Sequence, residues 1–290
     1  MATRASKQRV LAARICEIAD LAEAVADAHC PTGSVDPVAI ARKNRITSSF
    51  GHYGKAFDGM LEHKAGRFHI FCNLDQVRQP DSPRARFTFA HELGHFYLDE
   101  HRNALAAGRA PAHRSQCEYE SPNLVEQEAD HFASNLLMPP SRFTARAERA
   151  SVGFEGVLAL ANHFKTSVTS TAIRYAAADV APCAVVKWTR KGYSWKWLSS
   201  ATFRARFRKT IEAPEDVPDD SPTGKALAGQ DPPEAGYFQA GTTASAWFPR
   251  VGRGWLRDVI FIEQAMPLGR YGVLTFLYPE AGAYEFVNHQ

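Results

Sequence analysis

Cysteine is scarce in this sequence, and its few cysteines are scattered. The 290 residues include five of them: Cys16, Cys30, Cys72, Cys117 and Cys183. None stands in a Cys-x-x-Cys pair, which argues against a disulfide framework and against a zinc site made of thiolates. We therefore expect free thiols in a reducing compartment, and the cytoplasm fits that expectation.

The sequence also lacks a strong charge imbalance and a long apolar run. Its formal net charge of +3 gives no electrostatic reason for the whole chain to bind nucleic acid or a membrane surface. Acidic residues interrupt the apolar pattern near the N-terminus, and no later run is long enough to cross a bilayer. With 45% apolar residues, the sequence is typical of a folded, cytoplasmic protein without a membrane partner.

The periodicity of apolar residues divides the chain into three parts. Residues 1–150 mix helical and strand patterns, whereas residues 151–180 have the pattern of two helices joined by a short link. Residues 181–290 show the alternation that is typical of β-strands. We expect an α+β protein with these three domains.

Helix starts are marked by a capping residue followed by proline. Asp36 and Ser82 each precede a proline, and they predict helices over residues 37–42 and 83–100. Ser121 with Pro122 predicts a further helix of the same kind, which ends before two consecutive prolines because proline interrupts a helix interior.

Strand and loop signals fill the remaining stretches. Residues 66–72 alternate in the manner of a strand. Residues 212–236 are rich in proline, glycine and acidic side chains, and they predict a long exposed loop.

The segment from Ala90 to His95 contains the pattern His-Glu-x-x-His. Positions four apart on a helix differ by only about 40° around its axis, so His91 and His95 share a face and can reach one ion. Glu92 lies on the adjacent face. Its carboxylate is placed to act as a general base on a metal-bound water rather than to bind the metal.

A catalytic zinc ion takes three protein ligands and leaves a fourth position for water. The helix after residue 121 offers Glu126, Glu128 and His131 as the third ligand. We favour Glu126, because Asp130 lies one turn later on the same face and can orient a ligand imidazole through a hydrogen bond. Glu128 is the rival ligand, and His131 points away from the Glu126 face.

These two segments, residues 86–95 and 126–139, resemble the ImmA/IrrE family of zinc endopeptidases. In that family the ligands are the two histidines and the first glutamate of a Glu-x-x-Ala pattern, which here begins at Glu126. The resemblance covers about residues 35–145. His131 departs from it, because such sequences often carry a small, polar or basic residue at that position.

The resemblance implies a zincin-like, gluzincin-type metallopeptidase domain with zinc as its cofactor. It further implies that the protein cleaves or inactivates a helix-turn-helix transcriptional repressor in the cytoplasm, which would derepress a stress or mobile-element response. Residues 151–180 would then be a segment like a helix-turn-helix. Residues 181–290 would be a β-rich sensory domain, for which a GAF-like fold is one interpretation.

The remaining site predictions rest on chemistry alone. Tyr97, His113 and Tyr119 are candidate donors to a tetrahedral oxyanion. Outside that role, we expect His101 and His113 to be solvated surface residues. An extended substrate can add to a sheet edge, and residues 66–72 are our candidate strand, with an ordinary core strand as the alternative.

Two other classes of function compete with the endopeptidase. A DNA-binding regulator would use the helical pair, but its second helix offers only Arg174 as a cation, so we expect DNA binding to be weak or absent. A zinc-stabilised interaction protein without turnover would need no general base. The presence of Glu92 therefore favours the peptidase.

Overall fold

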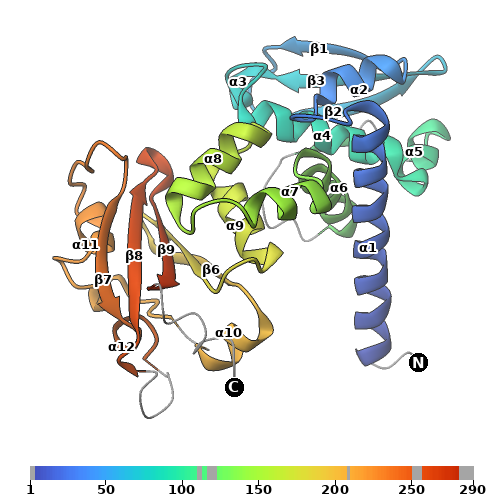
Figure 1. Cartoon of the computed structure of the whole chain (residues 1–290). Helices are drawn as coiled ribbons and strands as arrows, with labels where there is room; N and C mark the ends of the chain where they lie inside the picture. Colours follow the sequence, from blue (N-terminus) through green and yellow to red (C-terminus); the bar gives the residue numbers. More distant parts are fainter. Residues whose placement is uncertain (1–3, 110–112, 116–122, 208–209, 250–256, 281–290) are drawn as a thin grey trace. The chain divides into compact units, whose positions relative to one another are not determined.

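The computed structural model describes residues 4–109, 113–115, 123–207, 210–249 and 257–280. The chain forms two compact units, the first from residues 1–143 with 161–167 and the second from residues 144–160 with 168–290. Each unit contains one β-sheet covered by helices, so the fold is α+β as predicted (Figure 1). No helix within these ranges combines the length and the apolar character needed to cross a membrane.

The first unit surrounds a four-stranded sheet. Its elements, in chain order, are α1 (Arg4–His29), α2 (Pro37–Lys43), β1 (Thr47–Gly51), β2 (Gly59–Lys64), β3 (Arg67–Asn73), α3 (Leu74–Val77), α4 (Pro83–Tyr97), α5 (Asp99–Ala106), β4 (His113–Ser115) and α6 (Leu124–Leu137). Helix α4 packs against β2 and β3, and α6 packs against both α4 and the long helix α1. The core of the unit lies between these helices and the sheet.

The helix starts of the first unit follow the capping chemistry. The Asp36 carboxylate accepts hydrogen bonds from two backbone N–H groups of α2, and the Ser82 hydroxyl accepts one from Ala85 of α4. Helix α6 differs from the prediction, because it begins at Leu124 with Asn123 as its cap. The predicted start at Ser121 and Pro122 lies outside the described residues.

The strand predicted over residues 66–72 is present as β3, but it does not form an edge of the sheet. The strand order is β1-β3-β2-β4, so β3 is paired on both sides, in parallel with β1 and antiparallel with β2. Both rows of its backbone hydrogen-bonding groups are therefore occupied, and our expectation that this strand receives a substrate was wrong. The alternative of a core strand is confirmed.

The second unit is built on a five-stranded antiparallel sheet with the order β6-β5-β9-β8-β7. Its elements are α9 (Val168–Ala178), β5 (Ala184–Thr189), β6 (Gly192–Leu198), α10 (Ala201–Arg206), η1 (Pro214–Asp216), α11 (Pro222–Leu227), β7 (Phe238–Thr243), α12 (Ala244–Trp247), β8 (Ile260–Pro267), η3 (Gly269–Tyr271) and β9 (Val273–Pro279). Helices α7 (Pro140–Ala147) and α8 (Phe154–Phe164) contain points where the chain passes between the units.

The stretch predicted as an exposed loop over residues 212–236 differs from the prediction in containing a short helix, α11, whose residues Pro222, Thr223, Gly224 and Ala226 are buried. The buried carboxylate of Glu263 explains the difference. It accepts hydrogen bonds of 2.8 Å from the backbone N–H of Thr223 and from the indole N–H of Trp247, so α11 and α12 are both attached to β8. The predicted exposure is confirmed on both sides of this helix, where residues 218–220 and 228–230 are exposed.

Lys187 is an unusual residue in the sheet of the second unit. It lies on β5 between β6 and β9, and only 8% of its surface is exposed. Within the described residues its ammonium group has no hydrogen-bond partner. Burial lowers the pKa of Lys187 from 10.5 to about 8, because the charged form is desolvated.

We predict that Lys187→Met stabilises the protein by about 1–2 kcal/mol at pH 7. Between pH 8 and 10.5 the unfolded chain holds this proton more tightly than the folded chain. The destabilisation by Lys187 is therefore complete below about pH 8 and disappears as the pH rises through 10.5. Urea unfolding at pH 7 and pH 10.5 measures the change, with Lys196→Met as the control because Lys196 is paired with Glu212. A loss of stability in Lys187→Met would contradict the prediction.

Candidate metal centre

Helix α4 places His91 and His95 side by side in the interior of the first unit. Their Nε2 atoms are 3.1 Å apart, and at most 1% of either side chain is exposed. This is the arrangement that a spacing of four on one helix predicts. Their facing nitrogens can donate their lone pairs to one ion.

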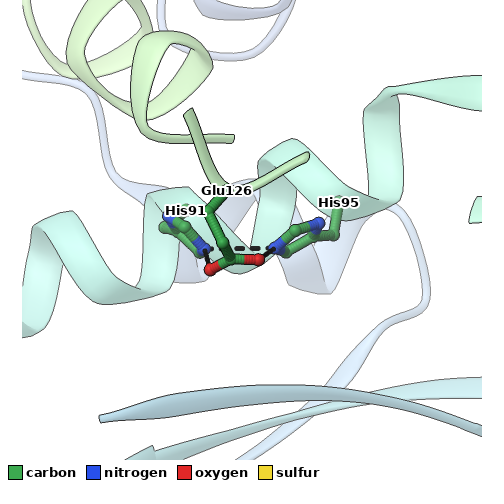
Figure 2. A group of neighbouring side chains, drawn as sticks. All are labelled: His91, His95 and Glu126. Carbon is green, nitrogen blue, oxygen red and sulfur yellow. Dashed lines mark hydrogen bonds and ion pairs between the residues drawn. The ribbon is translucent and has the colours of Figure 1, made fainter. Parts of the chain in front are cut away.

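Glu126 reaches the two histidines from α6, because α4 and α6 approach closely at Gly94 and Ala129. A Cβ atom on Gly94 would lie only 3.1 Å from the Cα and carbonyl oxygen of Ala129. Glu126 is three residues before Ala129, on the turn of α6 that faces the histidines. Figure 2 shows its carboxylate between the two imidazoles, with Oε2 3.3 Å from His91 Nε2 and Oε1 3.5 Å from His95 Nε2.

The three side chains fit a zinc ion. Donor atoms at about 2.05 Å from a tetrahedral zinc are about 3.3 Å apart. The two Nε2 atoms are 3.1 Å apart, and each lies 3.3 to 3.5 Å from one of the two Glu126 carboxylate oxygens. One donor atom from each residue lies within 4.8 Å of the other two. Two imidazoles and one carboxylate are also a ligand set that zinc takes in catalytic sites. Among the described residues, this is the group of side chains that could hold a metal ion.

Asp130 forms a hydrogen bond with His91 at Nδ1, the ring nitrogen that does not face Glu126. Its Oδ1 atom is 2.7 Å from His91 Nδ1, so a proton on Nδ1 is held there and Nε2 is left to face the ion. Burial alone would lower the pKa of His91. Hydrogen bonds with Asp130 and Glu126, together with the charge of Glu92, outweigh burial and raise the pKa to about 10. The carboxylates therefore make this a place where positive charge is stabilised.

Glu92 is completely buried beside β2, on the side of α4 that faces the sheet. The absence of a side chain at Gly59 makes room for it, because a Cβ there would lie 2.6 Å from Glu92 Oε1 and 2.6 Å from Thr88 Cγ2. The carboxylate thus occupies a fitted space next to the first residue of β2. Its charge acts on His91, as expected for a group near the candidate ligands.

The rival ligands lie elsewhere. Glu128 forms an ion pair with Arg14, with oxygen–nitrogen distances of 3.0 Å. His131 Nε2 is 3.1 Å from the carbonyl oxygen of Ile15. Both side chains are therefore engaged with α1 rather than with His91 and His95.

The candidate oxyanion donors receive little support. The Tyr97 hydroxyl accepts a hydrogen bond of 2.7 Å from Asn44, the residue that follows α2, and lies 3.3 Å from His29 Nε2 of α1. His113 lies on β4, but its side chain is outside the described residues, as is the whole of Tyr119. The oxyanion role of all three stays a prediction.

His101 was expected at the surface, and that expectation was wrong. Only 8% of it is exposed, its Nδ1 atom is 3.2 Å from His95 Nδ1, and its Nε2 atom is 3.2 Å from Glu128 Oε2. The reason is that the helix expected over residues 83–100 ends at Tyr97, and the chain turns at Leu98 into α5. The turn directs His101 back toward α4. No spacing rule connects residues 95 and 101 across such a break.

We predict that Gly59→Ala lowers the free energy of unfolding by about 1–3 kcal/mol, because the added methyl group would overlap with Glu92 and Thr88. Urea unfolding measures the loss. Gly241→Ala on β7 is the matched control, because its Cβ would meet only Ile260 Cγ2 at 3.7 Å. Equal effects of the two substitutions would show that the space beside Glu92 is not tightly fitted.

Comparison with known proteins agrees with this geometry. Residues 78–175 match the family described as the IrrE N-terminal-like domain, which is a peptidase family. The matched segment includes α4 and α6. No curated protein matches the chain in sequence. A solved Mycobacterium tuberculosis transcriptional regulator aligns with a TM-score of 0.58 at 12% identity, covering 93% of this chain and 78% of that one, and this likeness shows the fold alone. Residues 78–175 of this chain are therefore similar to the IrrE N-terminal-like domain of a peptidase family.

Proposed function

We propose that the protein is a zinc-dependent endopeptidase in which His91, His95 and Glu126 hold the metal and Glu92 is the general base. The observation that supports this most strongly is the convergence of the three side chains from two helices that are packed together, with one donor atom from each within 4.8 Å of the other two. The match to a peptidase family over the same helices supports the same activity. A structural zinc site would close its fourth position with a protein ligand and would need no general base.

Each residue has a separate task in this proposal. Zinc, when bound, supplies Lewis-acid activation of water and of the peptide carbonyl group. Glu92 accepts the proton of the attacking water at its carboxylate and later delivers a proton to the leaving amine. Asp130 keeps the proton of His91 on Nδ1. Gly59 leaves the space in which the Glu92 carboxylate is held.

The proposed place for an extended substrate is β4 rather than β3. Gly59 of β2 adjoins Glu92, and the same residue pairs with Ser115 of β4. In the part of the chain that the structure describes, β4 pairs with β2 alone and forms the edge of the sheet nearest Glu92. A peptide that adds to this edge through backbone hydrogen bonds would lie beside the proposed general base.

A helix-turn-helix repressor is the substrate class that we propose, because the family resemblance implies it. The DNA-binding alternative is weaker. One face of α9 is buried, and the helix packs against β5 and β6. Arg174 is the only basic residue in the sequence of this helix. Specific DNA binding depends on several contacts with phosphate groups. Packing within the second unit is thus the better interpretation of α9.

The second unit is proposed to be a sensory or recognition module. Its antiparallel sheet carries α10, α11 and α12 in the connections between β6, β7 and β8, an arrangement that suits a GAF-like interpretation. We propose a cytoplasmic location. The described cysteines, Cys16, Cys30, Cys72 and Cys183, are free, as expected in a reducing compartment.

We predict that the purified protein binds about one zinc ion per chain and that Glu126→Ala loses most of it, because one of three protein ligands is removed. Metal analysis after dialysis measures the loss. His131→Ala is the control on the same helix and should retain the ion, since His131 contacts the backbone of Ile15. Full zinc occupancy in Glu126→Ala would exclude Glu126 as a ligand.

We predict that Glu92→Gln keeps zinc and the fold but cleaves its substrate about 10²–10⁴-fold more slowly, because an amide cannot accept the proton of the attacking water. The assay is co-expression with the helix-turn-helix repressor encoded nearest to the gene, followed by mass analysis of fragments. Wild-type protein that binds zinc and leaves the repressor intact would contradict the proposed substrate. Cleavage by Glu92→Gln at the wild-type rate would contradict the proposed base.

A further inference from the structure

The two candidate zinc-binding histidines are supported in different ways. His91 Nδ1 faces a carboxylate, Asp130, at 2.7 Å. His95 Nδ1 faces a second imidazole instead, with His101 Nδ1 at 3.2 Å. His101 is itself buried and packs against His95, with ring centroids 5.2 Å apart.

The chemistry of a metal ligand assigns the protons of this pair. His95 must present the lone pair of Nε2 to the ion, so its single proton lies on Nδ1. That N–H can donate only to an acceptor, so His101 Nδ1 must be unprotonated and His101 Nε2 must carry the proton. His101 Nε2 lies 3.2 Å from Glu128 Oε2, which is an acceptor in the required place. One assignment therefore satisfies both contacts.

The contacts from His95 through His101 to Glu128 form a hydrogen-bond relay, and this relay continues to Arg14 of the N-terminal helix α1. Glu128 receives two hydrogen bonds of 3.0 Å from Arg14 of α1, and the same guanidinium donates one of 3.1 Å to Glu100. About a quarter of the Arg14 and Glu128 side chains is exposed. Arg14, Glu128 and His101 line a surface hollow of about 600 Å³. The inner end of the relay is thus buried, whereas the outer end is reachable from water.

We propose that His101 is a positioning residue for His95, and that Glu128 and Arg14 hold His101 in the tautomer that accepts the His95 proton. This proposal rests on the proposed zinc site. In this proposal Glu128 does not bind zinc but orients His101, which in turn contacts His95. The proposal also makes α1, which lies outside residues 78–175, part of the support of the metal centre.

Zinc affinity tests the proposal, because hydrogen bonds to a ligand imidazole set its orientation and basicity. His101→Leu fills a similar space without an acceptor. His101→Asn places an amide oxygen close to the position of Nδ1 and keeps an acceptor for His95. We expect His101→Leu to weaken zinc binding by about 10–100-fold in competition with a chelator, and His101→Asn to retain most of the affinity.

A second pair of variants tests the outer end of the relay without changing the core. Arg14→Met should weaken zinc binding by a few-fold. Arg142→Met is the matched control, because Arg142 also pairs with an acidic residue, Asp27 of α1, which is thirteen residues from Arg14 along that helix. Thermal unfolding of the zinc-free proteins shows which variants keep the fold, and the visible spectrum of the cobalt-substituted proteins reports on ligand geometry.

The outcomes are distinguishable. A folded His101→Leu protein with wild-type zinc affinity and an unchanged cobalt spectrum would show that His101 only fills space, and the proposal would be overturned. If His101→Leu does not fold, equal zinc affinities of Arg14→Met and Arg142→Met overturn it. Zinc binding that depends on the relay in a protein without cleavage supports the positioning role and removes only the peptidase function. A wild-type chain that binds no zinc overturns both.

Discussion

The contact between α4 and α6 at Gly94 and Ala129 is the constraint on which the first unit depends. A side chain at position 94 would push the helices apart, since its Cβ would meet backbone atoms of Ala129 at 3.1 Å and Phe132 Cβ at 3.3 Å. Gly94 lies between the two candidate zinc-binding histidines in the sequence, so this close approach of the helices coincides with the candidate metal site. Glycine destabilises a helix interior by about 1 kcal/mol relative to alanine. At position 94 it allows α6 to pack closely enough for the Glu126 carboxylate to lie beside His91 and His95.

The parts of the site that depend on one helix at a time were predictable from the sequence. The positions of His91, Glu92 and His95 follow from helical periodicity, and the caps at Asp36 and Ser82 follow from the demand of the first backbone N–H groups for acceptors. The geometry also places Glu126 and Asp130 with His91, as their spacing of four suggested. For the histidine pair and the caps the physical cause lies within a few residues of the position, whereas the approach of Glu126 and Asp130 to His91 depends on the packing of α6 against α4.

Features that depend on distant pairing were not predictable. Nothing in residues 66–72 indicates that β1 will cover one side of β3, because strand order is decided by tertiary packing. The burial of α11 depends on Glu263, about forty positions later. The burial of His101 depends on the end of α4 at Leu98, where the sequence has no proline or glycine to indicate a helix end. Its partner Glu128 belongs to α6 and also pairs with Arg14 of α1. Interactions of this kind become visible only when the chain is folded.

In the endopeptidase that we propose, the deep burial of the site would restrict which proteins can be cleaved. His95 and Glu92 have no exposed surface, and His91 is almost as enclosed. A folded domain is too wide to bring a peptide bond to atoms in that position, so a susceptible segment must first leave its own structure and become extended. The local unfolding free energy of the target then becomes part of the specificity. A signal that loosens a linker in the target would then regulate its cleavage without any change in the proposed endopeptidase.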